Sequence, residues 1–246
     1  MKKGERLARR IARAGICSRR EAERLIADGR VMVNGRVVDS PACNVTAEDE
    51  VLLDGEPLPS PEPVRLWRYH KPTGLIVSNH DEKGRPTIFD RLPPELGRVV
   101  TVGRLDMNSE GLLLLTNDGR LARELELPSR GWTRRYRVRA YGRVNPGALE
   151  KLKEGVTIDG VRYGSIDARI DRIQGANTWM TFALREGKNR EIRRICEHLG
   201  LKVNRLLRVS YGPFQLGDLK RGTVEEVPRK VLKEQLGRLF GQLEND

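Results

Sequence analysis

The first sixty positions show the spacing of a small helical and sheet-forming unit. Apolar residues at positions 5–14 fall on one side of a helix. The sequence SRRE at positions 18–21 has the form of a capping box and predicts the start of a second helix. Alternating apolar residues at 31–38, interrupted by Asn34-Gly35, predict a hairpin with a type I′ turn. A strand at 50–53 would complete a small sheet.

From position 64 onward the pattern becomes that of a larger mixed unit. Short apolar runs and period-two alternation predict strands, whereas apolar residues three and four apart predict helices. We expect strands at 67–71 and 75–78 across a Pro/Gly turn, and at 99–102, 112–115, 133–141, 179–184 and 203–211. We expect helices capped by Asp118, at 148–152, from 189 to 199 and, as a C-terminal helix, from 229 to 243. The fold class is therefore predicted to be α+β.

Charge and proline divide the chain near position 60. Positions 1–40 hold 11 basic and 5 acidic residues, whereas positions 41–62 hold 6 acidic residues and no basic one. This acidic stretch ends in the proline-rich sequence PLPSPEP at 57–63, which interrupts both helix and sheet. We expect one domain at 1–60 and a second at 61–246.

The composition indicates a polyanionic partner. The net charge is +12 and the pI is about 10, which favours nucleic acid binding. No apolar run approaches the roughly 20 residues that cross a bilayer, and no apolar stretch follows the basic N-terminus as in a secretory signal. Three scattered cysteines and three histidines form no ligand cluster, so we expect a cytoplasmic protein without a metal site or membrane contact.

The stretch GRLDMNSEGLLLLTNDG, at 103–119, places one carboxylate on a polar loop between two apolar runs. Asp106 would then lie at a sheet end, where rigid scaffolds often hold active residues. Capping a turn is the more common use of such an aspartate, and local chemistry alone favours that interpretation.

Two basic segments follow. On the expected strand at 133–141, Arg135, Arg137 and Arg139 share one face, which must meet either solvent or RNA, and Tyr136 lies on the other. On the expected helix from 189, apolar residues form the buried side and basic residues project elsewhere. The basic residues assigned to RNA contact in this segment are Lys188, Arg190 and Arg194.

A basic chain with one placed carboxylate suggests an enzyme that acts on RNA. Glycoside hydrolysis usually needs two carboxylates, and Glu110 lies four positions after Asp106 without a fixed separation. Phosphoryl transfer would require a P-loop or metal site, and base deamination a zinc-ligand signature; neither pattern occurs. The residues alone leave the reaction open.

The sequence GICSRREAERLIADGRVMVNGRVV, at 15–38, resembles the RNA-binding domain named after the fourth protein of the small ribosomal subunit. The resemblance covers roughly residues 4–52. It implies docking onto structured RNA, with Arg19 and Arg20 at the start of the second helix as contacts.

The loop sequence GRLDMNSEGLLLLTNDG resembles the catalytic motif of the pseudouridine synthases, in the branch that modifies ribosomal RNA. The resemblance extends to YHKPTGLIVSNHDEKGRPTIFDRLP, RRYRV, LREGKNREIRRICEHLG and VNRLLRVSYG. This branch includes type A enzymes, which modify small-subunit rRNA, and type B enzymes, which modify large-subunit rRNA; the type B enzymes are the most similar. This resemblance implies a catalytic domain with a mainly antiparallel sheet and flanking helices.

The resemblance also implies roles for individual residues. Asp106 would be the catalytic aspartate, and Arg193 the basic residue that pairs with it. Tyr136 would pack against the uracil ring and serve in proton transfer, while Leu206 lines the pocket. Arg104 would help to hold the flipped-out nucleotide.

The implied reaction is the isomerisation of uridine to pseudouridine in ribosomal RNA, with the large-subunit rRNA as the expected substrate. The base detaches, turns and rejoins through carbon, so no cofactor is needed. We expect a monomer. Two alternatives remain at this stage: a ribosome-assembly factor of the same fold that binds RNA without catalysis, and a glycosidase that releases a free base.

Overall fold

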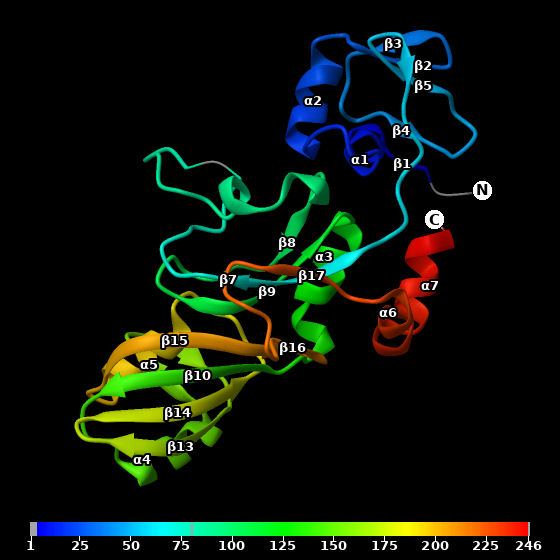
Figure 1. Ribbon diagram of the computed structural model, residues 1–246. Coiled ribbons are helices and arrows are strands. Elements are labelled where there is room, and N and C mark those ends of the chain that lie inside the picture. The colour runs from blue at the N-terminus through cyan, green and yellow to red at the C-terminus, as the bar shows by residue number, and fades with distance from the viewer. Residues whose placement is uncertain (1–3, 80, 246) are drawn as a thin grey trace.

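The computed structural model describes residues 4–79 and 81–245, in which a small N-terminal part precedes a larger part built on one sheet (Figure 1). In the N-terminal part, Leu7, Ile11 and Ile26 are fully buried in a core of their own. The helices are α1 (Leu7–Arg13) and α2 (Arg19–Ala27). The strands β1 (Glu5–Arg6) and β4 (Asn44–Val45) pair, and a four-stranded sheet has the order β3 (Arg36–Val38), β2 (Val31–Val33), β5 (Val51–Leu53) and β6 (Glu56–Pro57).

Local hydrogen bonding explains why these elements form where the sequence predicts. The Ser18 hydroxyl accepts a hydrogen bond from the Glu21 amide at 3.1 Å, which caps α2. Asn34 and Gly35 have φ values of 49° and 76°, and a type I′ turn requires positive φ at both positions. The predicted helix at 5–14 is shorter than expected, because Glu5–Arg6 pairs with β4 as a strand.

The larger part contains a nine-stranded sheet. Along its main path the order is β13 (Ile166–Gln174), β14 (Asn177–Leu184), β10 (Arg134–Tyr141), β15 (Lys202–Tyr211), β9 (Glu110–Thr116), β7 (Leu66–Lys71) and β17 (Val224–Glu226), while β8 (Val100–Val102) pairs with β9 and β16 (Phe214–Gln215) with β15. Every strand pair described in this sheet is antiparallel except β9 with β15, so the expected mainly antiparallel sheet is confirmed. A separate hairpin joins β11 (Val156–Ile158) and β12 (Val161–Tyr163).

Helices flank this sheet, as predicted. They are α3 (Gly119–Glu126), α4 (Pro146–Lys151), α5 (Glu191–His198), α6 (Arg229–Leu236) and α7 (Arg238–Asn245), with single 3₁₀ turns η1 (Phe89–Arg91), η2 (Pro94–Leu96), η3 (Pro128–Arg130) and η4 (Leu152–Glu154). The cap predicted for α3 is present, since the Asp118 carboxylate accepts hydrogen bonds from the Arg120 and Leu121 amides.

The parallel pairing of β9 with β15 divides the sheet into two halves. We name them the β10 half (β13, β14, β10 and β15) and the β9 half (β8, β9, β7 and β17). At the junction Glu110 pairs with Leu207 and Gly111 with Arg208. Gly111 has a φ of 108°, and a Cβ at this position would lie 2.7 Å from the Arg208 nitrogen and still closer to its carbonyl oxygen. Only glycine lets the two backbones approach this closely.

Helices cover opposite faces of the two halves. On the β10 half, α4 and α5 pack over inward-facing residues such as Val138 and Phe182. On the β9 half, α3, α6 and α7 pack over the opposite face, through Leu112 and Leu114. Tyr136 contacts both the core beneath α5 and the core that the loops at 75–105 form over the other side of the β9 half. In the part of the chain that the structure describes, no helix lies over the other face of the β10 half (Figure 1).

Two further predicted elements are wrong in detail. The segment 75–78 is not a second strand; it makes a single isolated bridge, from Ile76 to Thr87, because its neighbours form loops rather than a sheet edge. The C-terminal helix is two helices, separated at Gly237, whose φ of 51° interrupts the helical backbone. The edge strand β13 was not predicted.

Candidate active site

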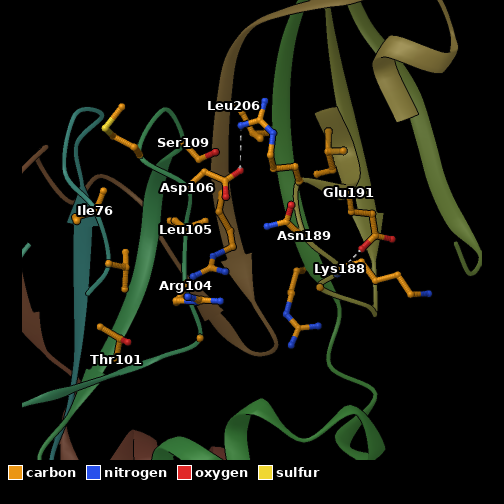
Figure 2. A pocket seen from close by; sticks show the side chains of 18 of the residues that line it. Ile76, Thr101, Arg104, Leu105, Asp106, Ser109, Lys188, Asn189, Glu191 and Leu206 are labelled. Carbon is orange, nitrogen blue, oxygen red and sulfur yellow. Dashed lines mark hydrogen bonds and ion pairs between the residues drawn. The ribbon is translucent and has the colours of Figure 1, made fainter. Parts of the chain in front are cut away.

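A cavity with a volume of 870 Å³ opens where the two halves of the sheet meet. Its walls come from the loop at 103–109, which we name the Asp106 loop, from β10 and β15, and from residues 187–192 at the start of α5. Figure 2 shows the two walls: Ile76, Arg104, Leu105 and Asp106 lie on one side, and Lys188, Asn189 and Glu191 on the other.

The Asp106 loop is a tight turn whose carboxylate is left available. The Asp106 carbonyl accepts a hydrogen bond from the Ser109 amide at 3.0 Å, and the Met107 carbonyl accepts one from the Gly74 amide at 2.8 Å. The turn is therefore held by backbone groups. The Asp106 side chain is 34% exposed, and in the described residues its ion pair is with Arg190, at 4.0 Å between Oδ2 and Nη1. The carboxylate does not cap the turn. This observation favours a functional role for Asp106 over the turn-capping role that local chemistry alone suggests.

Lys71, at the end of β7, lies beneath this loop and was not singled out in the sequence. Its side chain is fully buried, and its ammonium donates to the carbonyls of Asp106 at 3.1 Å and Ser109 at 2.9 Å. It also donates to the carbonyls of Pro72 and Met107. Desolvation lowers the pKa of Lys71 to about 8, although Asp106 and Glu110 oppose this shift. Lys71 thus fixes the backbone that carries Asp106.

Two arginines at the start of α5 reach the same loop. Arg190 immediately precedes the helix, with a left-handed φ of 50°, and forms the ion pair with Asp106. Arg193 is half-buried and donates to the Asn108 carbonyl at 2.8 Å. Burial and the neighbouring Arg190 lower the pKa of Arg193, while Asp106 raises it. The direct pairing of Arg193 with Asp106 stays a prediction; the arginine that the structure pairs with Asp106 is Arg190, which the sequence assigned to RNA contact.

The apolar part of the cavity lies on neighbouring strands. Leu206 of β15 is opposite Val138 of β10, and Tyr136 lies two positions before Val138 on the same face. Leu206 and Leu105 are buried, and Tyr136 is half-buried. These side chains line a site with apolar walls close to Asp106.

A buried basic group, missed in the sequence, lies at the floor of the cavity. Arg208 is 3% exposed, and its Nε donates to the Leu112 carbonyl at 2.7 Å. Its guanidinium lies 5.1 Å from the ring centre of Tyr211, and Arg134 stacks on the same ring at 4.8 Å. The Nη2 of Arg208 is buried without a hydrogen-bond partner in the described residues, so it can donate to a polar ligand in the cavity. Its burial on a strand gave no sequence signal.

The remaining predicted residues fall into three groups by their position relative to the cavity. Arg104 and Lys188 are exposed and line it. Arg194 is exposed on α5 but does not line it. Arg19 and Arg20 are exposed at the start of α2, in the N-terminal part. The site therefore brings together Arg104, Asp106, Tyr136, Lys188, Arg190 and Leu206, with Arg193 behind the loop.

Glu110, the other carboxylate near the loop, is already engaged. It is 2% exposed, and it forms ion pairs with Arg205 and, at 3.0 Å, with Arg221. A paired and buried carboxylate is poorly suited to act as a second catalytic acid or base beside Asp106. In the described part of the chain, no group of three or more His, Cys, Asp or Glu residues could hold a metal ion, and no helix is long and apolar enough to cross a membrane.

Comparisons with known proteins agree with this architecture. The family model of RNA pseudouridylate synthases matches residues 65–198, and the S4 domain model matches residues 5–51. A protein of Rickettsia bellii named an uncharacterized RNA pseudouridine synthase is 50% identical over 229 residues, which cover 93% of this chain and 99% of that protein. The ribosomal large subunit pseudouridine synthase B of Yersinia pestis is 42% identical, with 93% of this chain and 74% of that protein covered. A crystal structure of a pseudouridylate synthase superposes with a TM-score of 0.65 and 27% identity, over 94% of this chain and 99% of the other.

Proposed function

This chain belongs to the RNA pseudouridylate synthase family, and from that premise we propose that it isomerises a specific uridine of ribosomal RNA, with Asp106 as its catalytic residue. The observation that carries the residue assignment is the position of Asp106. Its carboxylate is partly exposed in a cavity with apolar walls, on a loop held by Lys71 and beside Arg190. The relatives named ribosomal large subunit pseudouridine synthase B support large-subunit rRNA as the substrate.

The isomerisation requires one bond to break and another to form at the same sugar carbon. The bond from uracil N1 to the anomeric carbon breaks, the base turns, and ring carbon five attaches instead. Carbon five then loses its proton and N1 gains one. One carboxylate can serve, either as a nucleophile toward the sugar or base, or by removing a sugar proton to give a glycal. Nothing is oxidised, and the reaction needs no cofactor.

The detached uracil must stay in the site until it rejoins the sugar. Leu105 and Leu206 supply buried apolar surface for this, and Tyr136 supplies a ring against which uracil stacks. The cavity volume of 870 Å³ lies in the range of sites that enclose small ligands, and it accommodates a flipped-out nucleotide. Unstacking the target costs a few kcal/mol, which phosphate contacts and stacking in the cavity offset.

Basic groups around the cavity supply those phosphate contacts. Arg104 and Lys188 lie on opposite walls of the cavity (Figure 2), so both can approach the backbone of an inserted nucleotide. Arg190 has two roles in this proposal: its charge faces Asp106, and its exposed side chain is accessible to RNA. Arg193 holds the Asp106 loop through Asn108 and adds positive charge behind it. Arg208 offers a buried donor to the base or sugar.

We further propose that residues 1–60 act as an RNA-docking domain and residues 61–246 as the catalytic domain with its C-terminal helices. The S4 match at 5–51 and the separate apolar core of this part support the division. Arg19 and Arg20 of α2 and Arg194 of α5 would contact RNA outside the cavity. We also propose that the enzyme acts in the cytoplasm as a monomer.

The assignment is tested with Asp106→Asn, which keeps the shape of the side chain and removes its charge. We expect the variant to form no pseudouridine in a large-subunit rRNA transcript while its affinity for that RNA stays within about twofold, because the carboxylate faces the base rather than the backbone. Asp218→Asn, at an exposed position away from the cavity, is the matched control and should keep full activity.

The same assay separates the alternatives. Full activity of Asp106→Asn would refute the catalytic role. Binding without conversion by the unaltered protein would support an RNA-binding assembly factor. Free uracil in solution would identify a glycosidase, whereas a carbon-linked base excludes one. Comparing pseudouridine positions in rRNA from cells with and without the protein identifies the target uridine.

A further inference from the structure

The uncovered face of the β10 half carries a concentration of arginines that the proposed reaction does not use. It consists of the outward-facing arginines of three strands of this half, which we name the basic face. They are Arg135, Arg137 and Arg139 on β10, Arg205 on β15, and Arg169 and Arg172 on β13. Because α4 and α5 pack on the other side of these strands, this face is open to solvent (Figure 1). The cavity with Asp106 lies on the helix-covered side.

Among the described residues, the three arginines of β10 have no acidic partner. Within the described residues, Arg135, Arg137 and Arg139 form no ion pair or hydrogen bond through their side chains. By contrast, Arg169 pairs with Asp171, and Arg205 with Glu110. Residues two apart on a strand are about 7 Å apart, so the three charges form a straight row along the sheet.

An aromatic side chain orders part of this row. Trp179 of β14 is half-buried beside Arg139 in the strand register. The guanidinium of Arg137 lies 5.1 Å from the ring centre of Trp179, and that of Arg205 lies 5.9 Å from it. Stacking restricts both side chains before any ligand arrives, which reduces the entropy lost on binding.

A polar face is also what any solvent-exposed sheet requires, but such surfaces usually mix charges of both signs. Here the acidic residues that face the same way on β13 are Asp167 and Asp171, and Asp171 is already bonded to Thr181 and Arg169. Six arginines face these two aspartates and Glu110, which pairs with Arg205, so an excess positive charge remains. An unpaired row of this kind fits a polyanion better than water alone.

We propose that the basic face binds the phosphate backbone of a second segment of the substrate RNA, apart from the segment that delivers the uridine. This rests on the proposed function, in which the ligand of the protein is a long folded rRNA. Since the cavity and the basic face lie on opposite sides of one sheet, the two RNA segments would enclose the β10 half between them. The basic face would then favour large folded substrates over an isolated stem-loop.

The test is a triple variant, Arg135→Gln/Arg137→Gln/Arg139→Gln, compared with the control Lys230→Gln/Lys233→Gln/Arg238→Gln. The control positions are exposed on or beside α6, and both variants lose three positive charges. The RNAs are an unmodified large-subunit rRNA transcript and the short stem-loop around the uridine that the unaltered protein modifies. Equilibrium binding to each RNA is measured over a series of salt concentrations, together with kcat and KM.

For the long transcript we expect the triple variant to raise Kd and KM by about tenfold, with kcat within twofold, and to lower the slope of log K against log salt by about 2. With the stem-loop, Kd and KM should match those of the control. Equal behaviour of the two variants on the transcript would overturn the inference, as would an equal loss on both RNAs. Binding to the transcript does not depend on turnover, so absent turnover by the unaltered protein would refute the proposed function, while the transcript affinities of the two variants would still decide this inference.

Discussion

Arg190 places its guanidinium 4.0 Å from the Asp106 carboxylate from a left-handed backbone conformation, with a φ of 50°. The other non-glycine residues with positive φ in the described chain are Asn34, Asp54 and Asp159, types that tolerate this region. For a residue such as arginine the conformation costs about 1–2 kcal/mol. Strained residues at cavity edges often take part in the function of the site. Here the backbone of Arg190 directs its charge from one wall of the cavity toward Asp106 on the other.

We predict that Arg190→Gln lowers kcat/KM by roughly tenfold, or about 1.4 kcal/mol in transition-state free energy, because Asp106 loses its paired charge. Arg190→Lys should retain more activity, since it keeps the charge. Thermal unfolding of both variants should stay close to that of the unaltered protein, because the side chain is exposed. Lys151→Gln, on the surface of α4, is the control. Unchanged kinetics in Arg190→Gln would show that the ion pair has no catalytic consequence.

The candidate site shows what local sequence could predict and what it could not. The apolar runs predicted the strands that end on either side of Asp106, and the alternation of side chains predicted the two faces of β10. Both features depend only on residues that are neighbours in the chain. The contacts of Lys71 could not be predicted, since they join β7 to carbonyls more than 30 positions later. The roles of the individual site residues came from family resemblance and stay predictions until variants are measured.

Lys71→Met should lower kcat by at least tenfold with a smaller effect on RNA affinity. Methionine fills the same buried space, but it donates nothing to the loop carbonyls, so Asp106 would lose its fixed position. Kinetics on the rRNA transcript, with RNA binding measured alongside, separates the two effects. A variant with normal kcat would show that the backbone contacts alone hold the loop.

The pH dependence gives an independent test of Lys71. The pKa of Lys71 is about 8, below the ordinary 10.5. Above pH 8 its ammonium therefore becomes a neutral amine, which has one fewer N–H to donate to the loop carbonyls. We expect kcat to fall above pH 8. The Lys71 contribution to folding stability has the opposite sign: burial disfavours the charged form, so this contribution rises between pH 8 and 10.5, where the unfolded state binds more protons. Urea unfolding across this range should show that rise, and Lys71→Met should remove it. A flat kcat profile from pH 7 to 9 would contradict the role of the ammonium.

The junction of the two sheet halves predicts a strong effect at Gly111. Gly111→Ala combines a positive φ with a Cβ that meets the Arg208 backbone, so we expect a loss of about 3 kcal/mol or more in the free energy of unfolding. Gly119→Ala is the matched control, because that glycine has open space and begins α3, where alanine is favourable. Denaturant unfolding measures both. Equal stability of the two variants would show that β9 and β15 can move apart without a loss in the free energy of unfolding.

The same contrast applies to the fold. The caps by Ser18 and Asp118 were predictable because each bonds a backbone amide two or three positions away. The parallel pairing of β9 with β15 was not, since it joins residues about 97 positions apart and depends on Gly111. The break at Gly237 was missed because the apolar spacing continues across it.

The proposed docking role of the N-terminal part predicts a change in binding rather than in chemistry. Arg19 and Arg20 are exposed at the start of α2, and within the described chain Arg19 pairs with Glu23 whereas Arg20 forms no ion pair that would neutralise it. Arg19→Gln/Arg20→Gln should therefore raise KM for the rRNA transcript about three- to tenfold and lower the salt slope by about one to two units, with kcat unchanged. Steady-state kinetics at several salt concentrations measures this, and Lys230→Gln/Lys233→Gln, with the same loss of charge, is the control. A fall in kcat at saturating RNA would mean that these arginines act on the chemical step, and a KM equal to that of the control would remove them from the RNA interface.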